Sequence, residues 1–596
     1  MGAERSLSRL DAAFSLSLRD HGLLIGYCCA LFGISLIGGR PLTLHESVLP
    51  QSAREMLADG DWIVPKKGGE PWLESPPLPQ WCTVAIATVI GRCDAEWIVR
   101  IGPALVATLT VWLTAWMATV WYGRTIGVLS GLMLATACQF LRYAWLAEDE
   151  IYLCGLVTAT IAWFVRLEFV ERESDAAPGL YRVFLGTRPW PVVLFFILLG
   201  CTNLAKGLIF GTAMAVIPLI GWLGWNRDWQ RASKYLWVWG WAIYGLLLVA
   251  WPLASMWREP SVADVWWYDL GGRLTGEYTE INQPLWYYVA SLPWMIAPWT
   301  LLVPFGIAAT WQAARSERNS PARFLWAWAV LVPLVFSIPG GKHHHYLLHA
   351  LAPWTILAAL GAEGFRRWLA TWPRWVVHPA VGVLTLGVPL MIGLTILSHR
   401  DLLPGPRGTY LVLMTVIPIA AFCLTWGLHH GQGKVVAATA FSTILICAAA
   451  GHWYAGQYFD THRFDVALLR RTRSMLENSS ATVVVDLSRS PLSGFLELFY
   501  LPDNARSIHN ISFLNDESLP NELLLLTPAG NVAGLEQLGA VSQLDRSERP
   551  LKADKESSRL TLLAVKLRDD LPRQSTAELS ISPMQAMQRA EGPVLR

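Results

Sequence analysis

The chain has 596 residues, of which 53% are hydrophobic and 15% charged, with 32 tryptophans and a mean hydropathy of +0.36. This composition is typical of an integral membrane protein and excludes an ordinary soluble globular domain. The formal net charge is +2 and the basic residues are scattered, which argues against nucleic acid as a partner. Nine cysteines lie mostly in apolar runs without CxxC spacing, so neither a disulfide framework nor a zinc site is expected.

Apolar stretches of membrane-spanning length recur along residues 1–458. The first, at about 21–39, is expected to be a retained span, because no small-residue cleavage site follows it. About thirteen such stretches are predicted in all, with an uncertainty of about two because neighbours can merge. They lie near residues 22–39, 98–121, 125–141, 151–170, 189–203, 208–226, 235–257, 286–312, 323–338, 346–364, 375–397, 409–428 and 434–456.

The connections between these stretches differ in their content of basic residues. One alternating set is rich in Arg and Lys and is predicted to face the cytoplasm by the positive-inside rule. The opposite set is poorer in them and faces outward; it comprises residues 40–97, 142–150, 203–207, 258–285, 339–345 and 399–408. The polar clusters that could carry chemistry fall in this second set. We therefore predict one site at the outer membrane surface.

The tail, from about residue 459 to residue 596, has a different character. It begins with an amphipathic helical pattern and continues with the β-rich runs "ATVVVDL", "ELLLLTP" and "RLTLLAVKL", which are separated by turn residues. These features predict a small soluble α/β domain on the extracytoplasmic side. The stretch from about Arg568 lacks periodicity and is expected to be loose.

The first outward loop contains the segment "HESVLPQSAREMLADGDWIVPKKGGEPWLESPPLPQW" at residues 45–81. It resembles the first extracytoplasmic loop of the GT-C fold glycosyltransferases that use lipid-linked sugars, in particular the bacterial aminoarabinose (lipid A) transferases and the protein O-mannosyltransferases. Further elements of that family are resembled by "LAEDEIYL", "LAKG", "QPLWYYVASLPWMIAPW" and "GGKHHHYLL", so the resemblance covers roughly the first 365 residues.

The resemblance implies an all-α polytopic membrane fold and a specific reaction. A sugar on a polyprenyl phosphate is attacked by an acceptor hydroxyl or phosphate with inversion at the anomeric carbon, and the polyprenyl phosphate leaves. Such chemistry needs a base near the acceptor and cations near the phosphate. The outer ends of the helices suit a donor whose isoprenoid lies in the bilayer and whose sugar phosphate lies at the interface.

Four residues are candidates for the catalytic side of this site. The resemblance places His45 where the family has the Asp of an Asp-Glu pair, while Glu46 keeps the second position. A neutral imidazole still accepts a proton, so His45 is a possible base; the alternatives are lost activity, or a pair that only caps the following helix. Glu150 matches the acid of the family's second loop, with Asp149 beside it, and either positions the acceptor or supports His45. A solvated loop end is the alternative.

Five more residues are candidates for substrate binding. Lys206 interrupts a long apolar run, so it must meet an anion or reach the lipid headgroups. The donor phosphate is the preferred partner, with Lys342, next to the histidines and Tyr346, as a second candidate for it and Arg273 as a third. Glu74 matches a family acid or braces the following prolines.

No cofactor and no tightly held metal are predicted, although a divalent ion is possible. At the Glu74 position a single carboxylate supplies too few ligands, and three consecutive histidines on a helix do not converge on one ion. The expected partners are a polyprenyl-phosphate sugar, an acceptor of unknown kind (lipid, glycan or protein) and membrane lipids. The predicted location is the bacterial cytoplasmic membrane, with the site on its outer face.

Two other functions remain open at this stage. One is a non-catalytic homologue that binds the lipid-linked sugar, which His45 favours. The other is a transporter of such lipids, which would be expected to show two repeated halves with interrupted helices and charges in mid-span. The sequence shows neither feature.

Overall fold

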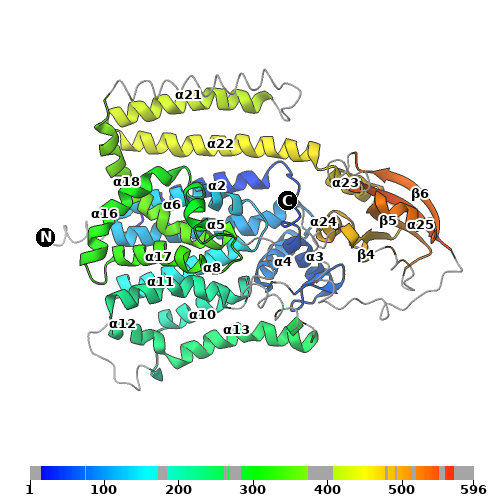
Figure 1. The fold of residues 1–596 in the computed structure, drawn as a ribbon, viewed down its shortest axis with the longest axis horizontal. Helices are drawn as coiled ribbons and strands as arrows, with labels where there is room; N and C mark the ends of the chain where they lie inside the picture. The colour runs from blue at the N-terminus through cyan, green and yellow to red at the C-terminus, as the bar shows by residue number, and fades with distance from the viewer. Residues whose placement is uncertain are drawn as a thin grey trace. The chain divides into compact units, whose positions relative to one another are not determined.

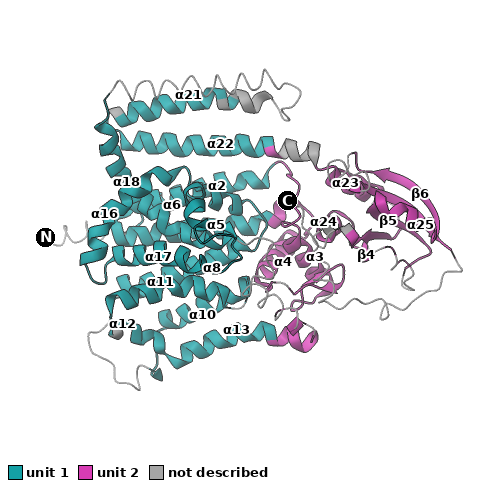
Figure 2. Ribbon diagram, viewed as in Figure 1, with its two compact units in different colours: residues 1–37, 100–252, 269–454 teal, residues 38–99, 253–268, 455–596 magenta. Residues whose placement is uncertain are grey.

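The computed structural model describes residues 15–73, 75–171, 184–207, 209–260, 262–263, 266, 283–373, 407–476, 481–489, 493–508, 511, 514, 519–548 and 558–568. Most of these residues are helical (Figure 1). The chain divides into two compact units, shown in Figure 2: unit 1 comprises residues 1–37, 100–252 and 269–454, and unit 2 comprises residues 38–99, 253–268 and 455–596. The first outward loop and the tail thus belong to the same unit.

Unit 1 is a bundle of apolar helices. In chain order it contains, whole or in part, α2 (Leu18–Gly33), η1 (Ile34–Leu36), α5 (Glu96–Tyr122), α6 (Arg124–Thr136), α7 (Cys138–Ala144), α8 (Glu150–Val165), η2 (Arg166–Val170), α10 (Trp190–Ala205), α11 (Phe210–Asn226), α12 (Trp229–Ser233), η3 (Lys234–Leu236), α13 (Val238–Arg258), α15 (Tyr287–Met295), η4 (Trp299–Leu302), α16 (Val303–Ser316), α17 (Pro321–Phe336), η5 (His344–Ala350), α18 (Leu351–Ala370), α21 (Arg407–His429) and α22 (Gly433–His462). α21 and α22 form a helical hairpin (Figure 1).

Among the described residues, five helices are long and apolar enough to cross a membrane, or up to seven if each bent pair counts as one span. The bent pairs explain part of the difference from the thirteen predicted stretches. The stretch at 125–141 folds as α6 and α7, which meet at 67°, and the stretch at 286–312 folds as α15 and a second helix that meet at 106°. Four further apolar helices have only 10–17 residues. The predicted stretch at 375–397 lies outside the described residues.

Unit 2 combines short helices with two sheets. It contains α3 (Val48–Asp59), β1 (Lys66–Lys67), β2 (Glu70–Pro71), α4 (Leu78–Ile90), α23 (Phe464–Leu476), β3 (Val483–Asp486), η7 (Leu487–Arg489), α24 (Ser493–Tyr500), β4 (Arg506–Ile508), β5 (Glu522–Pro528), η9 (Ala529–Asn531), α25 (Val532–Leu535), β6 (Gly539–Arg546) and β7 (Leu560–Leu567). β1 and β2 form a small antiparallel hairpin in the first outward loop.

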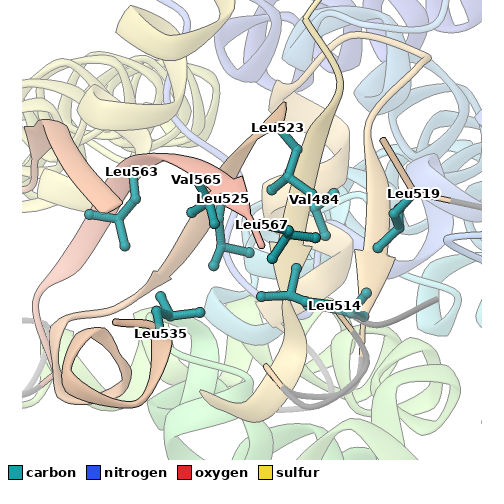
Figure 3. Close-up of a cluster of buried hydrophobic side chains, with 10 residues drawn as sticks. Val484, Leu514, Leu519, Leu523, Leu525, Leu535, Leu563, Val565 and Leu567 are labelled. Carbon is teal, nitrogen blue, oxygen red and sulfur yellow. The ribbon is translucent and has the colours of Figure 1, made fainter. Parts of the chain in front are cut away.

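The larger sheet has the strand order β4-β3-β5-β7-β6. β3 pairs in parallel with β4 and β5, and the other neighbours are antiparallel. One face of the sheet covers a cluster of buried aliphatic side chains that includes Val484, Leu525 and Leu563 (Figure 3). The three β-rich runs predicted from the sequence therefore form β3, β5 and β7, and the predicted amphipathic helix is α23.

Candidate functional site

A cluster of charged side chains gathers at the ends of three elements of unit 1. Asp149 is the N-cap residue of α8 and Glu150 is its first residue, while Lys206 is the C-cap residue of α10. α8 packs against both α10 and η5, and η5 contributes His345 and Tyr346. Side chains that lie far apart in the sequence are thereby brought to one place.

Lys206 forms the centre of this cluster. Its Nζ donates a hydrogen bond to Oε1 of Glu150 at 2.5 Å and lies 3.5 Å from Oδ1 of Asp149. The side chain of Lys206 is 19% exposed, so the ion pair is largely removed from water. Two carboxylates facing one ammonium group leave an excess of negative charge when all three are ionised.

His345 approaches the same carboxylate from the other side. Its Nε2 lies 3.6 Å from Oε1 of Glu150, and its Nδ1 shares a hydrogen bond of 3.3 Å with the hydroxyl of Tyr143. Oε2 of Glu150 is buried and has no hydrogen-bond partner among the described residues. A buried carboxylate oxygen in this state is uncommon in a folded protein, and the neighbouring Asp149 can donate to Glu150 when it is protonated.

The cluster borders a small cavity. Glu150, Lys206, His345, Tyr346 and Phe210 contribute to its wall, together with apolar residues of α8 and α11. Its volume is about 10 Å³, close to the least that accommodates one water molecule. The cavity therefore has room for a water or a single polar atom next to Glu150.

The environment shifts the protonation of Asp149 and Lys206 in a consistent way. Burial, and then the charge of Glu150, raise the pKa of Asp149 above its ordinary value, although Lys206 acts in the opposite direction. Burial alone lowers the pKa of Lys206, but Asp149 and Glu150 outweigh that effect and the net shift of this pKa is upward. Lys206 therefore stays charged, and Asp149 holds its proton to a higher pH than an ordinary aspartic acid does.

The remaining predicted substrate-binding residues occupy different settings. Lys342 is buried and donates a hydrogen bond of 2.8 Å from Nζ to the carbonyl oxygen of Gln283. The ring of Tyr346 packs against the rings of Phe210 and His345. Arg273 and Glu74 lie outside the described residues, so their predicted roles stay predictions.

The predicted pair of His45 and Glu46 lies in unit 2, in the turn that precedes α3. The side chain of Glu46 is fully buried, and Nη2 of Arg40 donates to its two oxygens at 2.9 and 3.1 Å. The backbone N–H of Thr43 also donates to Glu46, and the Thr43 hydroxyl accepts from the Glu46 backbone N–H. His45 is exposed. Glu46 thus anchors the turn, and His45 projects from it.

Arg40, Tyr143 and His345 take part in these arrangements but were not among the candidate site residues predicted from the sequence. Arg40 precedes Glu46 by six residues across a turn, a spacing that has no standard helical or strand meaning. Tyr143 precedes the acidic loop and would be counted as an interfacial aromatic residue. Among the described residues, no group of three or more His, Cys, Asp or Glu side chains is arranged to hold a metal ion.

Comparisons with known proteins agree with this architecture. Residues 50–266 match the family model described as dolichyl-phosphate-mannose-protein mannosyltransferase. An undecaprenyl phosphate-alpha-4-amino-4-deoxy-L-arabinose arabinosyl transferase from Enterobacter sp. (strain 638) is 27% identical over 413 residues, which are 67% of this chain and 70% of that protein. A relative of the same name from Edwardsiella ictaluri is 28% identical over 53% of this chain, but the match spans only 54% of that protein.

A similar fold is known from a crystal structure. ArnT from Cupriavidus metallidurans bound to undecaprenyl phosphate aligns with a TM-score of 0.66 at 18% identity, over 91% of this chain and 97% of that chain. The predicted resemblance to GT-C fold glycosyltransferases is thus confirmed, and the chain has the fold of this class. The family match contains Asp149, Glu150 and Lys206 but ends before His345.

Proposed function

We propose that the chain is an inverting glycosyltransferase that moves a sugar from a polyprenyl-phosphate donor to an acceptor at the outer face of a bacterial cytoplasmic membrane. The names of the curated relatives support the class of donor, as does the ArnT structure with bound undecaprenyl phosphate. The observation that carries the proposal is the buried cluster of Lys206, Glu150 and Asp149 at the helix ends of this fold.

The reaction assigns a distinct task to each member of the cluster. The acceptor oxygen forms a bond to the anomeric carbon, the bond from that carbon to the phosphate oxygen breaks, and polyprenyl phosphate leaves with the electron pair. The acceptor proton passes to a carboxylate, for which Asp149 is suited by its raised pKa. Lys206 stabilises the charge that develops on the leaving phosphate.

Lys206 can perform this task while it remains paired. An ammonium group has three N–H donors, and the two carboxylates engage at most two of them. The third is left for a phosphate oxygen of the donor. Glu150 fixes the position of Lys206, and its unpaired oxygen offers an acceptor for a sugar or acceptor hydroxyl.

We assign further contacts of the donor to Lys342 and Tyr346, with Arg273 and Glu74 as additional candidates. Lys342 uses one donor on a backbone carbonyl and directly precedes the histidines at residues 343–345 in the sequence. Tyr346 already borders the cavity beside Lys206. These roles rest on the resemblance together with those two contacts.

The pair in the first outward loop has a divided role in this proposal. His45, being exposed, accepts a proton or binds the acceptor, whereas Glu46 is a positioning residue that acts through its bonds to Arg40 and Thr43. We also propose about thirteen spans in total, a division into a membrane domain (1–458) and an extracytoplasmic α/β domain (459–596), and a site that faces the extracytoplasmic side.

The test uses the purified protein in lipid nanodiscs with a panel of polyprenyl-phosphate sugars. Release of free polyprenyl phosphate is followed for the wild type and for Lys206→Gln, His45→Ala and Glu46→Ala. Release by the wild type that is lost in Lys206→Gln supports a transferase built on this cluster. An active Lys206→Gln protein would remove the cluster from the mechanism.

A second candidate is a homologue that binds the lipid-linked sugar without turning it over. His45, in place of an acidic residue of the family, favours it, as does the neutralisation of Lys206 by carboxylates of the same chain. Saturable donor binding by the wild type without release, for every sugar in the panel and with a mixture of acceptors, would establish this candidate instead.

A further inference from the structure

Unit 2 contains a cavity of about 640 Å³ that shares no residue with the Lys206 cluster. Its wall combines α3 of the first outward loop, the segment 91–94 after α4, the end of α23 and the segment 502–504 after α24. The volume lies within the range of sites that bind small molecules or headgroups. Residues from both ends of the sequence build it, so the fold of unit 2 as a whole shapes this space.

One pair of charges in the wall has a structural task. Nε of Arg54 donates to Asp503 at 2.6 Å, and its other nitrogens donate to the carbonyl oxygens of Leu498, Phe499 and Leu501 at 3.0 Å. Arg54 thereby closes the C-terminal end of α24. Its hydrogen-bonding capacity is used, and we assign it no ligand.

A second group of charged side chains in the wall has fewer hydrogen bonds and contains two cations for one anion. Arg92 after α4 and Arg473 on α23 both donate to the carboxylate of Asp94. Each guanidinium uses one nitrogen for this contact, and their other N–H groups have no hydrogen bond to any residue in the described part of the chain. Two cations therefore share one anion at the edge of an open cavity, and their side chains are 57% and 30% exposed.

We propose that this cavity is a binding site for a phosphate ester, carried by a soluble sugar phosphate or by a lipid headgroup. A guanidinium presents its N–H groups as a planar fork that matches phosphate oxygens, and a phosphate has enough acceptors to engage both arginines. Leu57, Ala58 and Leu476 form an apolar part of the wall, on which the uncharged part of the ligand packs. Binding at this cavity does not depend on a sugar donor bound at the Lys206 cluster.

Asp94 makes the proposal testable in two directions. It occupies one edge of both guanidiniums and repels an incoming anion. Its pKa is lowered to about 2, because the bonds from both arginines outweigh its burial, so it is ionised at every pH at which the protein is handled. Only substitution removes its charge.

The experiment measures binding of glucose 1-phosphate by calorimetry to the full chain in neutral phosphatidylcholine nanodiscs, without any sugar donor. The wild type is expected to bind saturably. Arg92→Gln and Arg473→Gln should each weaken binding about tenfold, and Asp94→Asn should tighten it severalfold, because it frees two guanidiniums. Arg471→Gln is the matched control, since this neighbour on α23 pairs with Asp545 and does not border the cavity.

Nanodiscs that contain phosphatidic acid separate the two sources of the phosphate. Loss of glucose 1-phosphate binding in them identifies a lipid headgroup as the occupant, and unchanged binding identifies a soluble ester. Absence of binding by the wild type in neutral nanodiscs, or weaker binding by Asp94→Asn than by the wild type, would overturn the proposal. Arg92 is mostly exposed, so its variant tests the site even if Arg473→Gln fails to fold. Donor turnover, measured separately, reports on the proposed transferase alone.

Discussion

The buried ion pairs Arg40–Glu46 and Lys206–Glu150 differ in how completely their polar atoms are satisfied. Both oxygens of Glu46 accept hydrogen bonds, from Arg40 and from the backbone of Thr43. Glu150 has one oxygen on Lys206 and the other unpaired among the described residues, beside a cavity. A fully satisfied pair such as Arg40–Glu46 is typical of a structural anchor, whereas an unsatisfied oxygen beside a cavity costs stability, and we propose that the Lys206–Glu150 pair takes part in the reaction.

Replacement of Glu150 by Gln is the strongest test of the Lys206–Glu150 pair, which we call the open pair because one oxygen of Glu150 lacks a hydrogen bond among the described residues. It removes the charge that holds Lys206 in place, so release of polyprenyl phosphate should fall by about 10³-fold, the upper end for losing one group that stabilises developing charge. The measurement is a single-turnover assay at saturating donor. Glu148→Gln, a neighbouring acid in the same loop, is the control and should retain activity. Equal loss in both variants would show that the loop, and not Glu150, is sensitive.

Replacement of Glu46 by Gln tests the closed pair, Arg40–Glu46, and should lower the stability of the folded protein. It removes the charge of Glu46 from the buried pair with Arg40, and breaking such a pair costs about 3–5 kcal/mol in the free energy of unfolding. Denaturant or thermal unfolding in nanodiscs measures this cost. The double variant Arg40→Met with Glu46→Leu should recover part of the stability. A Glu46→Gln protein with unchanged stability and no turnover would show that Glu46 acts on the reaction and not on stability, and would erase the contrast between the two pairs.

Lys206 and Glu150 could both be chosen as candidates from the sequence, but their pairing could not be predicted. Lys206 interrupts an apolar run, and Glu150 matches an acid of the resembled family's second loop, so both are predicted site residues. From the sequence, Lys206 is expected to meet the donor phosphate, and Glu150 to position the acceptor or support His45. The structure joins them, because α8 packs against α10 and brings two helix ends together, a contact between distant segments that no local pattern reports.

For the fold as well, the sequence located individual elements but did not show how distant segments are arranged. Alternation and β-branched residues located β3, β5 and β7, but not their order in the sheet. Windows of hydropathy located the apolar stretches, but not their direction, so the 67° bend between α6 and α7 within residues 125–141 was missed. In the first outward loop, the pair of His45 and Glu46 was visible, whereas the partner of Glu46 was not.

The pH dependence of turnover tests whether Asp149, which lies beside the open pair, acts as the base. Its pKa is raised by burial and by Glu150, so the carboxyl stays protonated at pH values where an ordinary Asp, with a pKa near 3.9, has ionised. If Asp149 is the base, turnover should rise with pH well above that value. Asp149→Asn should lose about 10²-fold and should lack this acid limb. A variant that keeps the limb would assign it to another group, such as His45.

The smallest expected effect belongs to Tyr143, which touches the cluster only through His345. Tyr143→Phe removes the hydroxyl that bonds Nδ1 of His345 and leaves the ring in place. The loss of one such bond is worth about 0.5–1.5 kcal/mol, so turnover should fall by about two- to tenfold. Tyr244→Phe is the matched control, because its buried hydroxyl bonds Thr212 outside the cluster. A larger loss for Tyr143 than for Tyr244, at equal stability, means that the orientation of His345 matters to the reaction. Equal and small losses would confine the residues that matter to the reaction to Lys206, Glu150 and Asp149.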